Sequence, residues 1–228
     1  MAAGFGAFGK MPDVGDFFRF NVPGGFVRVW DNWLQQLLME GQAQYGAGFD
    51  THYMSAPLWR FTLAAGLAGP SKIMGVLMPS VDRVGRRFPL TLVLPLDTPG
   101  PPALDHLREG ALFENLEEIA LSTLENGMTK SRLEEDLQAI EVPGLRASVP
   151  LRHEGETLVL TGSGGDDALV ATHLAGVLLA KQVPGGGVWS THLESGPRML
   201  VKVDLPLGRA GSGLFDLAAP IWREAQPI

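Results

Sequence analysis

Two apolar segments separated by an arginine-rich turn restrict the folds that this chain can adopt. Ile73–Met78 and Phe88–Leu94 are nearly continuous runs of apolar residues. Strands of this kind are typically buried on both faces of a sheet, so we expect Ile73–Met78 to be a central strand. The segment Pro79–Leu90 follows the first run, overlaps the start of the second and reads PSVDRVGRRFPL. This composition predicts a polar turn joining two buried strands.

Helical and strand patterns alternate along the rest of the chain. Apolar residues recur at helical spacing from Phe26 to Leu38, with Pro23 near the start and Gly41 as the expected stop. Further helices are predicted at residues 104–124, 131–140, 166–181 and 215–224, and further strands at residues 5–8, 58–63, 157–161, 187–193 and 197–205. This alternation favours an α/β protein: a three-layer α/β/α sandwich with a mixed sheet, in a single domain over residues 1–228.

The composition restricts the chemistry and the compartment of the protein. The 228 residues include no cysteine, which excludes disulfides and thiolate metal sites and fits a reducing compartment. No apolar run approaches the roughly 18 residues of a membrane-spanning helix. The N-terminus has no basic segment ahead of an apolar one, so it does not read as a signal peptide. We therefore expect a cytoplasmic protein with no direct membrane insertion.

The net charge of −7 is concentrated in the middle of the chain. Residues 1–100 carry 8 basic and 7 acidic side chains, residues 101–142 carry 3 and 10, and residues 143–228 carry 7 and 8. Because no segment is strongly basic, a nucleic-acid partner is not expected. The acidic block is most typical of a solvated helix face, although a basic partner would also suit it.

The glycine-rich and histidine-containing segments predict no catalytic or cofactor site. Gly4–Lys10 fits two nucleotide-binding patterns, but the strand that both patterns need has no room before it, and Met11 replaces the magnesium-binding hydroxyl. Gly162–Gly165 precedes Asp166 and Asp167, which favours a capped turn over a phosphate site. The five histidines show no metal-ligand spacing, and no G-x-S-x-G elbow is present. We expect no cofactor and no metal.

The arginine-rich turn is the exception among these motifs. Ser80, Asp82, Arg83, Arg86 and Arg87 lie between strands too apolar to be exposed. Arginines in such a turn can bind a carboxylate or phosphate through two parallel hydrogen bonds. Alternatively, Asp82 pairs with one arginine and fastens the turn internally. Both interpretations hold together if one arginine is structural and another is presented.

Several blocks of the sequence also match the pattern of a known family. They are Gly6–Pro12, Gly15–Phe17, Pro23, Phe26, Trp30–Leu34, Ala56–Phe61, Gly75–Arg86 and Phe88–Leu90, with weaker matches at Val188–Ser190, Leu205–Pro206 and Phe215. Together they resemble the TagF (ImpM) family of proteins associated with bacterial type VI secretion. The specific part of the resemblance covers about residues 4–96.

The resemblance implies a three-layer α/β fold and a non-enzymatic regulator that restrains type VI assembly after translation. It also implies a forkhead-associated scaffold protein as the partner, and it carries over no catalytic residue. The family signature gives the candidate interaction or structural residues. They are Lys10, Asp16, Trp30, Trp59, Arg60, Ser80, Asp82, Arg83 and Arg86.

Two hypotheses for the function follow. In the first, the protein is a binding regulator in which Asp82 is the internal partner and Arg83 and Arg86 contact the scaffold protein. In the second, it is a small-molecule or nucleotide-binding enzyme. The second hypothesis requires Lys10 and Asp16 to converge with the charged residues at 80–87 in one pocket.

Overall fold

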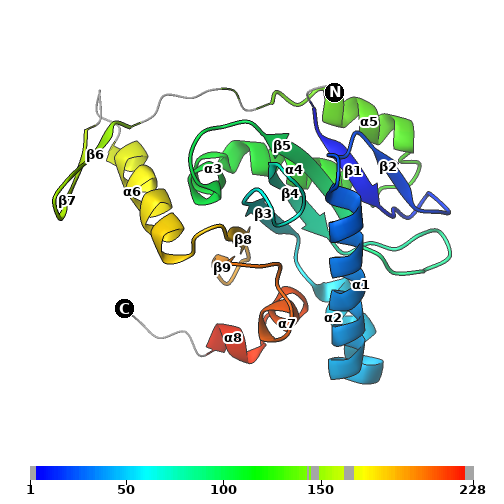
Figure 1. The fold of residues 1–228 in the computed structure, drawn as a ribbon. Coiled ribbons are helices and arrows are strands. Elements are labelled where there is room, and N and C mark those ends of the chain that lie inside the picture. Colours follow the sequence, from blue (N-terminus) through cyan, green and yellow to red (C-terminus); the bar gives the residue numbers. More distant parts are fainter. Residues whose placement is uncertain (1–3, 143, 145–148, 162–166, 224–228) are drawn as a thin grey trace.

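A seven-stranded sheet with helices on both faces forms the centre of the protein (Figure 1). The structure is a computed structural model, and it describes residues 4–142, 144, 149–161 and 167–223. The strand order is β2-β1-β5-β4-β3-β8-β9. The strands are β1 (Gly6–Gly9), β2 (Phe18–Phe20), β3 (Trp59–Leu63), β4 (Lys72–Met78), β5 (Leu90–Leu96), β8 (Gly187–Thr191) and β9 (Arg198–Lys202). The prediction that the apolar run at 73–78 is central is confirmed, since β4 is the middle strand and is buried throughout.

The prediction of a mixed sheet is wrong, because every strand pair in this sheet is antiparallel. Parallel neighbours need a crossover connection of about a dozen residues or more, usually a helix. Here β3 joins β4 through residues 64–71, β4 joins β5 through residues 79–89, and β8 joins β9 through residues 192–197. These links are hairpin-like connections between neighbours. The α/β class itself is confirmed, with helices on both faces of the sheet.

Helices from distant parts of the sequence cover each face. The helices are α1 (Phe26–Tyr45), α2 (Phe49–Ser55), α3 (Pro102–Arg108), α4 (Gly110–Ser122), α5 (Lys130–Gln138), α6 (Asp167–Gln182), α7 (Arg209–Phe215) and α8 (Pro220–Arg223), with a 3-10 turn at Gly46–Gly48. One core lies under α1, α2 and α7, and the other lies under α4 and α5. In the first core, Trp30 from α1 stacks on Trp189 with nearly parallel rings, 5.9 Å between centroids.

Several helix boundaries differ from the predictions for physical reasons. Helix α1 continues past Gly41 because the Phe49 ring packs against that glycine, where a Cβ atom would lie 2.3 Å from the ring. The single helix predicted at 104–124 is two helices, since the backbone leaves helical geometry at Glu109 (φ −94°, ψ 36°). The helix predicted at 131–140 begins at Lys130, and Thr129 caps it by accepting from the Arg132 N–H. The terminal helix predicted near 215–224 is shorter than expected, because α7 ends at Phe215 and α8 begins only at Pro220.

The short strand β2, helix α2 and strand β6 (Leu151–Glu154) were not predicted from the sequence. Strand β6 pairs with β7 (Thr157–Leu160) in a hairpin that lies beside α6, away from the main sheet (Figure 1). The predicted turn at Gly162–Gly165 and its alternative cap Asp166 lie outside the described residues. Within the residues that the structure describes, no helix is long and apolar enough to cross a membrane.

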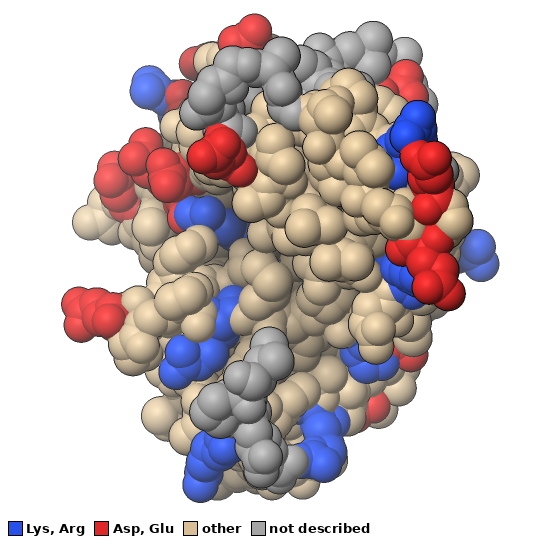
Figure 2. Space-filling view, turned by 90° about the vertical axis from the view of Figure 1, so that its left-hand side faces the viewer, with Lys and Arg blue, Asp and Glu red and all other residues tan. Residues whose placement is uncertain are grey.

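The face of the molecule that carries α6 and the β9 edge has a broad uncharged centre, with acidic and basic side chains around its margins (Figure 2). Among the coloured residues of that view, the basic side chains are scattered from top to bottom and do not form one continuous surface. This face therefore offers no basic stripe of the kind that follows a nucleic-acid backbone.

Candidate functional site

The arginine-rich turn is a closed hairpin between β4 and β5. Val81 and Arg87 form an isolated antiparallel bridge across it. The Asp82 N–H donates to the Arg86 carbonyl over 3.1 Å, and the Gly85 N–H donates to the Asp82 carbonyl over 2.8 Å. Gly85 has a φ of 82°, a left-handed conformation that glycine adopts without steric cost. The backbone geometry of the turn is therefore fixed by local bonds and by this glycine.

Asp82 is the centre of the turn and is almost completely buried. One carboxylate oxygen accepts from Lys10 Nζ (2.9 Å) and from Arg86 Nε (2.6 Å). The other accepts from the backbone N–H groups of Val84 (3.1 Å) and Arg86 (2.9 Å). Burial alone would raise the pKa of Asp82, but these bonds from Lys10, Arg86 and Val84 outweigh it and hold that pKa well below its usual range. The internal pairing proposed for Asp82 is thus present in the structure.

The two candidate contact arginines occupy different environments. Arg86 donates from Nε to Asp82 and from Nη2 to the Gly15 carbonyl (2.9 Å), and it lies 3.6 Å from the Asp16 carboxylate. Arg83 is exposed, and within the described part of the chain no hydrogen-bond acceptor or carboxylate pairs with its guanidinium. Arg86 therefore fastens the turn to the β1–β2 loop, whereas Arg83 is presented to solvent.

Tyr53 on α2 holds the base of the turn. Its hydroxyl donates to the Ser80 carbonyl (2.7 Å) and accepts from the Ser80 N–H (3.0 Å), and both residues are buried. The Ser80 hydroxyl has no hydrogen-bond partner among the described residues. The contribution of Ser80 to the turn is therefore made by its backbone. Tyr53 could not be identified from the sequence, because the apolar pattern of α2 is too short to be recognised.

Trp30, Trp59 and Arg60 are parts of the core. The Trp30 indole donates to the Thr91 hydroxyl over 2.8 Å, and the Trp59 indole donates to the Leu214 carbonyl over 2.9 Å. Arg60 on β3 forms two 2.7 Å hydrogen bonds with the Glu117 carboxylate on α4. These three residues tie helices of both layers to the sheet. The acidic helix face, which was predicted to be solvated, is therefore partly internal, because Glu117 pairs with Arg60 of the sheet.

A buried polar chain centred on His106 was not expected from the sequence. The Nδ1 atom of His106 lies 3.0 Å from the Thr62 hydroxyl, and its Nε2 atom lies 2.8 Å from the Ser190 hydroxyl. Burial lowers the pKa of His106 to about 3, with smaller contributions from the nearby charges of Arg60 and His192. The imidazole is therefore neutral. Although it touches a serine, this group is closed to solvent, so it serves as a structural link between α3, β3 and β8.

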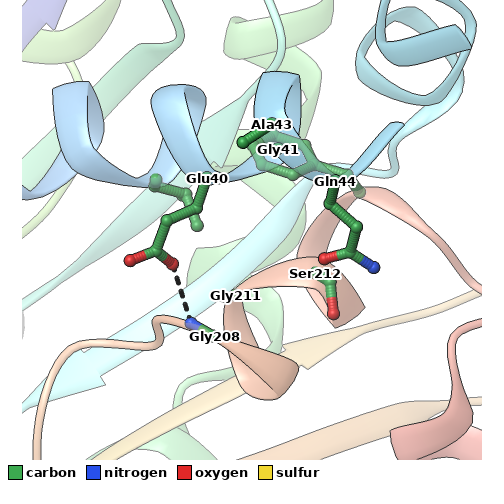
Figure 3. Close-up of a pocket in the computed structure, with 9 residues that line it drawn as sticks. Glu40, Gly41, Ala43, Gln44, Gly208, Gly211 and Ser212 are labelled. Atoms are coloured by element: carbon green, nitrogen blue, oxygen red, sulfur yellow. Dashed lines mark hydrogen bonds between the residues drawn. The ribbon is translucent and has the colours of Figure 1, made fainter. Parts of the chain in front are cut away.

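A concave site lies between α1 and α7, and its lining offers few groups that could take part in a reaction (Figure 3). Its wall is mainly apolar, and its one carboxylate, Glu40, accepts from the Gly208 N–H over 2.8 Å. Among the described residues, no group of three histidine, aspartate or glutamate side chains could hold a metal ion.

The pocket required by the enzyme hypothesis is only partly assembled. Lys10, Asp16, Asp82 and Arg86 do come together, but they are bonded to one another. Lys10 also lies over the Phe17 ring, 4.8 Å from its centroid. Arg83 is exposed on the same turn. Counting only residues that the structure describes, the arrangement leaves Arg83 as a cation without a partner and places no base in contact with a nucleophile.

Comparisons with known proteins agree on one family. The model of the TagF N-terminal domain, described as type VI secretion system-associated, matches residues 6–140, which extends beyond the segment 4–96 that carried the resemblance. The crystal structure of PA0076 from Pseudomonas aeruginosa PAO1 is 28% identical and has a TM-score of 0.77, covering 98% of this chain and 97% of that one. No curated protein matches the chain. The matched region runs from β1 through α5 and contains the whole arginine turn, and on this evidence the chain belongs to the TagF N-terminal domain family, which is associated with type VI secretion.

Proposed function

We propose that this protein is a non-enzymatic, cytoplasmic regulator of type VI secretion, and that it acts by binding a forkhead-associated scaffold protein. The observation that carries the proposal is the state of the arginine turn. The buried Asp82 binds Lys10 and the Nε of Arg86, which fixes the turn, while Arg83 stays exposed without a partner among the described residues. A free guanidinium on a rigid support is suited to a carboxylate or phosphate of a partner, because little conformational entropy is lost on binding.

The bonding of the ionisable groups in the described part of the chain favours binding over catalysis. Lys10, Asp82 and Arg86 are bonded to one another, and the histidine beside a serine is closed to solvent. The family membership supports the link with type VI secretion. Repression of assembly as the outcome of binding is part of the proposal.

The test is a binding measurement on folded protein. Arg83→Glu should weaken binding of the forkhead-associated protein at least about tenfold in calorimetry, because a cation at the contact becomes a like charge. Arg28→Glu, an exposed arginine on the first turn of α1, is the matched control and should bind normally. Equal affinities for wild type and Arg83→Glu would remove this residue from the interface. An absence of binding by the wild type would refute the proposed partner.

Arg86→Glu was also expected from the sequence to test the contact with the partner, but the structure makes it a poorer test than Arg83→Glu. The new carboxylate would stand beside the buried Asp82 carboxylate in place of a bonded cation. Loss of binding in that variant would then report a disturbed turn as readily as a lost contact.

A further inference from the structure

An open groove lies beside the arginine turn, on the side that faces α1 and α2. Its lining comes from three segments: Leu38, Met39 and Gln42 of α1, Phe49 of α2, and Gly85, Arg86 and Arg87 of the turn. Leu38, Met39 and Gln42 are spaced as neighbours on one helix surface. The groove therefore has one helical wall and one wall made by the turn.

The groove combines an exposed apolar surface with positive charge. Met39 is 71% exposed, which is unusual for a methionine and leaves its thioether free for contact. Phe49 is buried, and the Arg87 guanidinium lies over its ring, 5.5 Å from the centroid. Both charged residues in the lining are arginines, and 58% of the Arg86 side chain is accessible.

The carboxylates near the groove leave these arginines able to accept another anion. Asp50 is paired with Arg87, and its side chain is 71% exposed. Asp16 is paired with Arg86, and its side chain is 95% exposed. The Arg86–Asp16 pair is exposed on both sides and contributes little to stability, so an incoming carboxylate can replace or share it, while Arg86 Nε stays bonded to Asp82. The Arg87–Asp50 pair is half-buried on the arginine side, so an incoming carboxylate can share Arg87 with Asp50. A guanidinium presents five donors and can serve two carboxylates at once.

We propose that this groove binds an acidic segment of the partner protein that carries at least one apolar side chain. The apolar side chain covers Leu38 and Met39, and the carboxylates beside it meet Arg86 and Arg87. This inference rests on the proposed function and extends it, because it names the chemistry of the segment that is recognised. At the tip of the same turn, Arg83 and the 71%-exposed Val84 repeat the combination of cation and apolar side chain.

The charge of the chain favours a partner segment over a second copy as the occupant. The chain has its own acidic surface on α4, where Leu121 is 53% exposed, so a head-to-tail contact between copies is conceivable. Each copy carries a net charge of −7, however, so association between copies works against overall repulsion. A contact between different faces would also tend to form open chains of molecules instead of a closed dimer.

The test uses two methionines with similar exposure. Met39→Glu places a negative charge in the groove, and Met54→Glu places the same charge on α2 at a methionine that is 59% exposed and does not line the groove. With the forkhead-associated protein as the probe, we expect Met39→Glu to weaken binding at least about tenfold and Met54→Glu to leave it unchanged. Circular dichroism and thermal melting of each variant confirm folding.

A variant that should gain affinity tests the groove even if Met39→Glu destabilises the helix. Gln42 is exposed in the lining, and Gln42→Lys adds a cation where an acidic segment would lie. We expect it to tighten binding about two- to fivefold and to make binding more sensitive to salt. A weaker complex with Gln42→Lys would overturn the acidic assignment.

The possible outcomes separate the two proposals. If the wild type binds the scaffold protein and all three variants bind equally well, the groove assignment is overturned while the proposed function stands. If the wild type does not bind that protein, the proposed function itself fails. Light scattering and co-sedimentation with phosphatidylglycerol vesicles complete the design. If Met39→Glu abolishes oligomer formation but leaves scaffold binding intact, the groove binds a second copy and the inference is overturned. If Met39→Glu abolishes vesicle binding but leaves scaffold binding intact, the groove binds a lipid surface and the inference is likewise overturned.

Discussion

Removal of one hydroxyl group at the base of the arginine turn should destabilise the protein measurably. The substitution is Tyr53→Phe, which keeps the ring and its packing. It deletes the hydroxyl that donates to the Ser80 carbonyl and accepts from the Ser80 N–H. Tyr53 is fully buried and Ser80 is 2% exposed, so water cannot easily replace the lost partner.

The magnitude follows from what each Ser80 group retains. The Ser80 carbonyl still accepts from the Phe88 N–H over 3.1 Å, so it loses one of two bonds, which costs about 0.5–1.5 kcal/mol. The Ser80 N–H is left without a partner in a buried position, which costs about 1–3 kcal/mol. We expect the free energy of unfolding to fall by about 2–3 kcal/mol. For a chain of this size that corresponds to roughly 5–10 °C in melting temperature.

Urea unfolding followed by circular dichroism measures this change, with a lower midpoint and an unchanged slope expected. The only other tyrosine, Tyr45, provides the control. Its hydroxyl donates to Asp216 over 3.3 Å near the surface, so Tyr45→Phe should change the free energy of unfolding by less than about 0.5 kcal/mol. Equal effects of the two substitutions, or a loss below about 0.5 kcal/mol for Tyr53→Phe, would refute the assignment of Tyr53 as the anchor of the turn.

Two further predictions concern the turn itself. Ser80→Ala removes a buried hydroxyl that has no partner among the described residues, so it should be neutral or stabilising by up to about 1 kcal/mol in urea unfolding, and a loss above about 1 kcal/mol would show that the hydroxyl is bonded. The folded-state pKa of Asp82 is depressed, so its stabilising contribution is complete above the unfolded-state value near 4 and is lost as the pH falls toward the folded-state value. Unfolding free energies measured between pH 7 and pH 3 should therefore decline more steeply for the wild type than for Asp82→Asn, and parallel curves would contradict the internal role of Asp82.

The sequence predicted most elements because their patterns are local. The apolar runs that became β4 and β5 needed no partner to be recognised, and the helical spacing from Phe26 to Leu38 identified α1. The failures have tertiary causes. Gly41 reads as a helix stop in isolation, but the Phe49 ring occupies the space above it and the helix continues. Likewise, strand direction depends on which neighbours pair, and single-strand patterns do not carry that information.

The candidate site was predicted by composition and resolved only by packing. From the sequence alone, a turn with one aspartate and three arginines between buried strands indicates an internal ion pair, a presented cation, or both. Which arginine forms the internal ion pair and which is presented to solvent depends on groups far away in the sequence. Lys10 reaches Asp82 from β1, and the Gly15 carbonyl holds Arg86 from the β1–β2 loop. Tyr53 anchors Ser80 from α2.

The sequence by itself determined that Pro79–Leu90 is a polar turn between buried strands, because chain-local hydrophobicity and turn chemistry are sufficient for that. The tertiary structure decided that Asp82 is enclosed, that Arg86 is bonded to it and that Arg83 is exposed. It also placed an apolar groove with Met39 beside the turn. The physical reason is that burial and hydrogen bonding arise from contacts between segments tens of residues apart, and these contacts determine which of several identical side chains remains available for a partner.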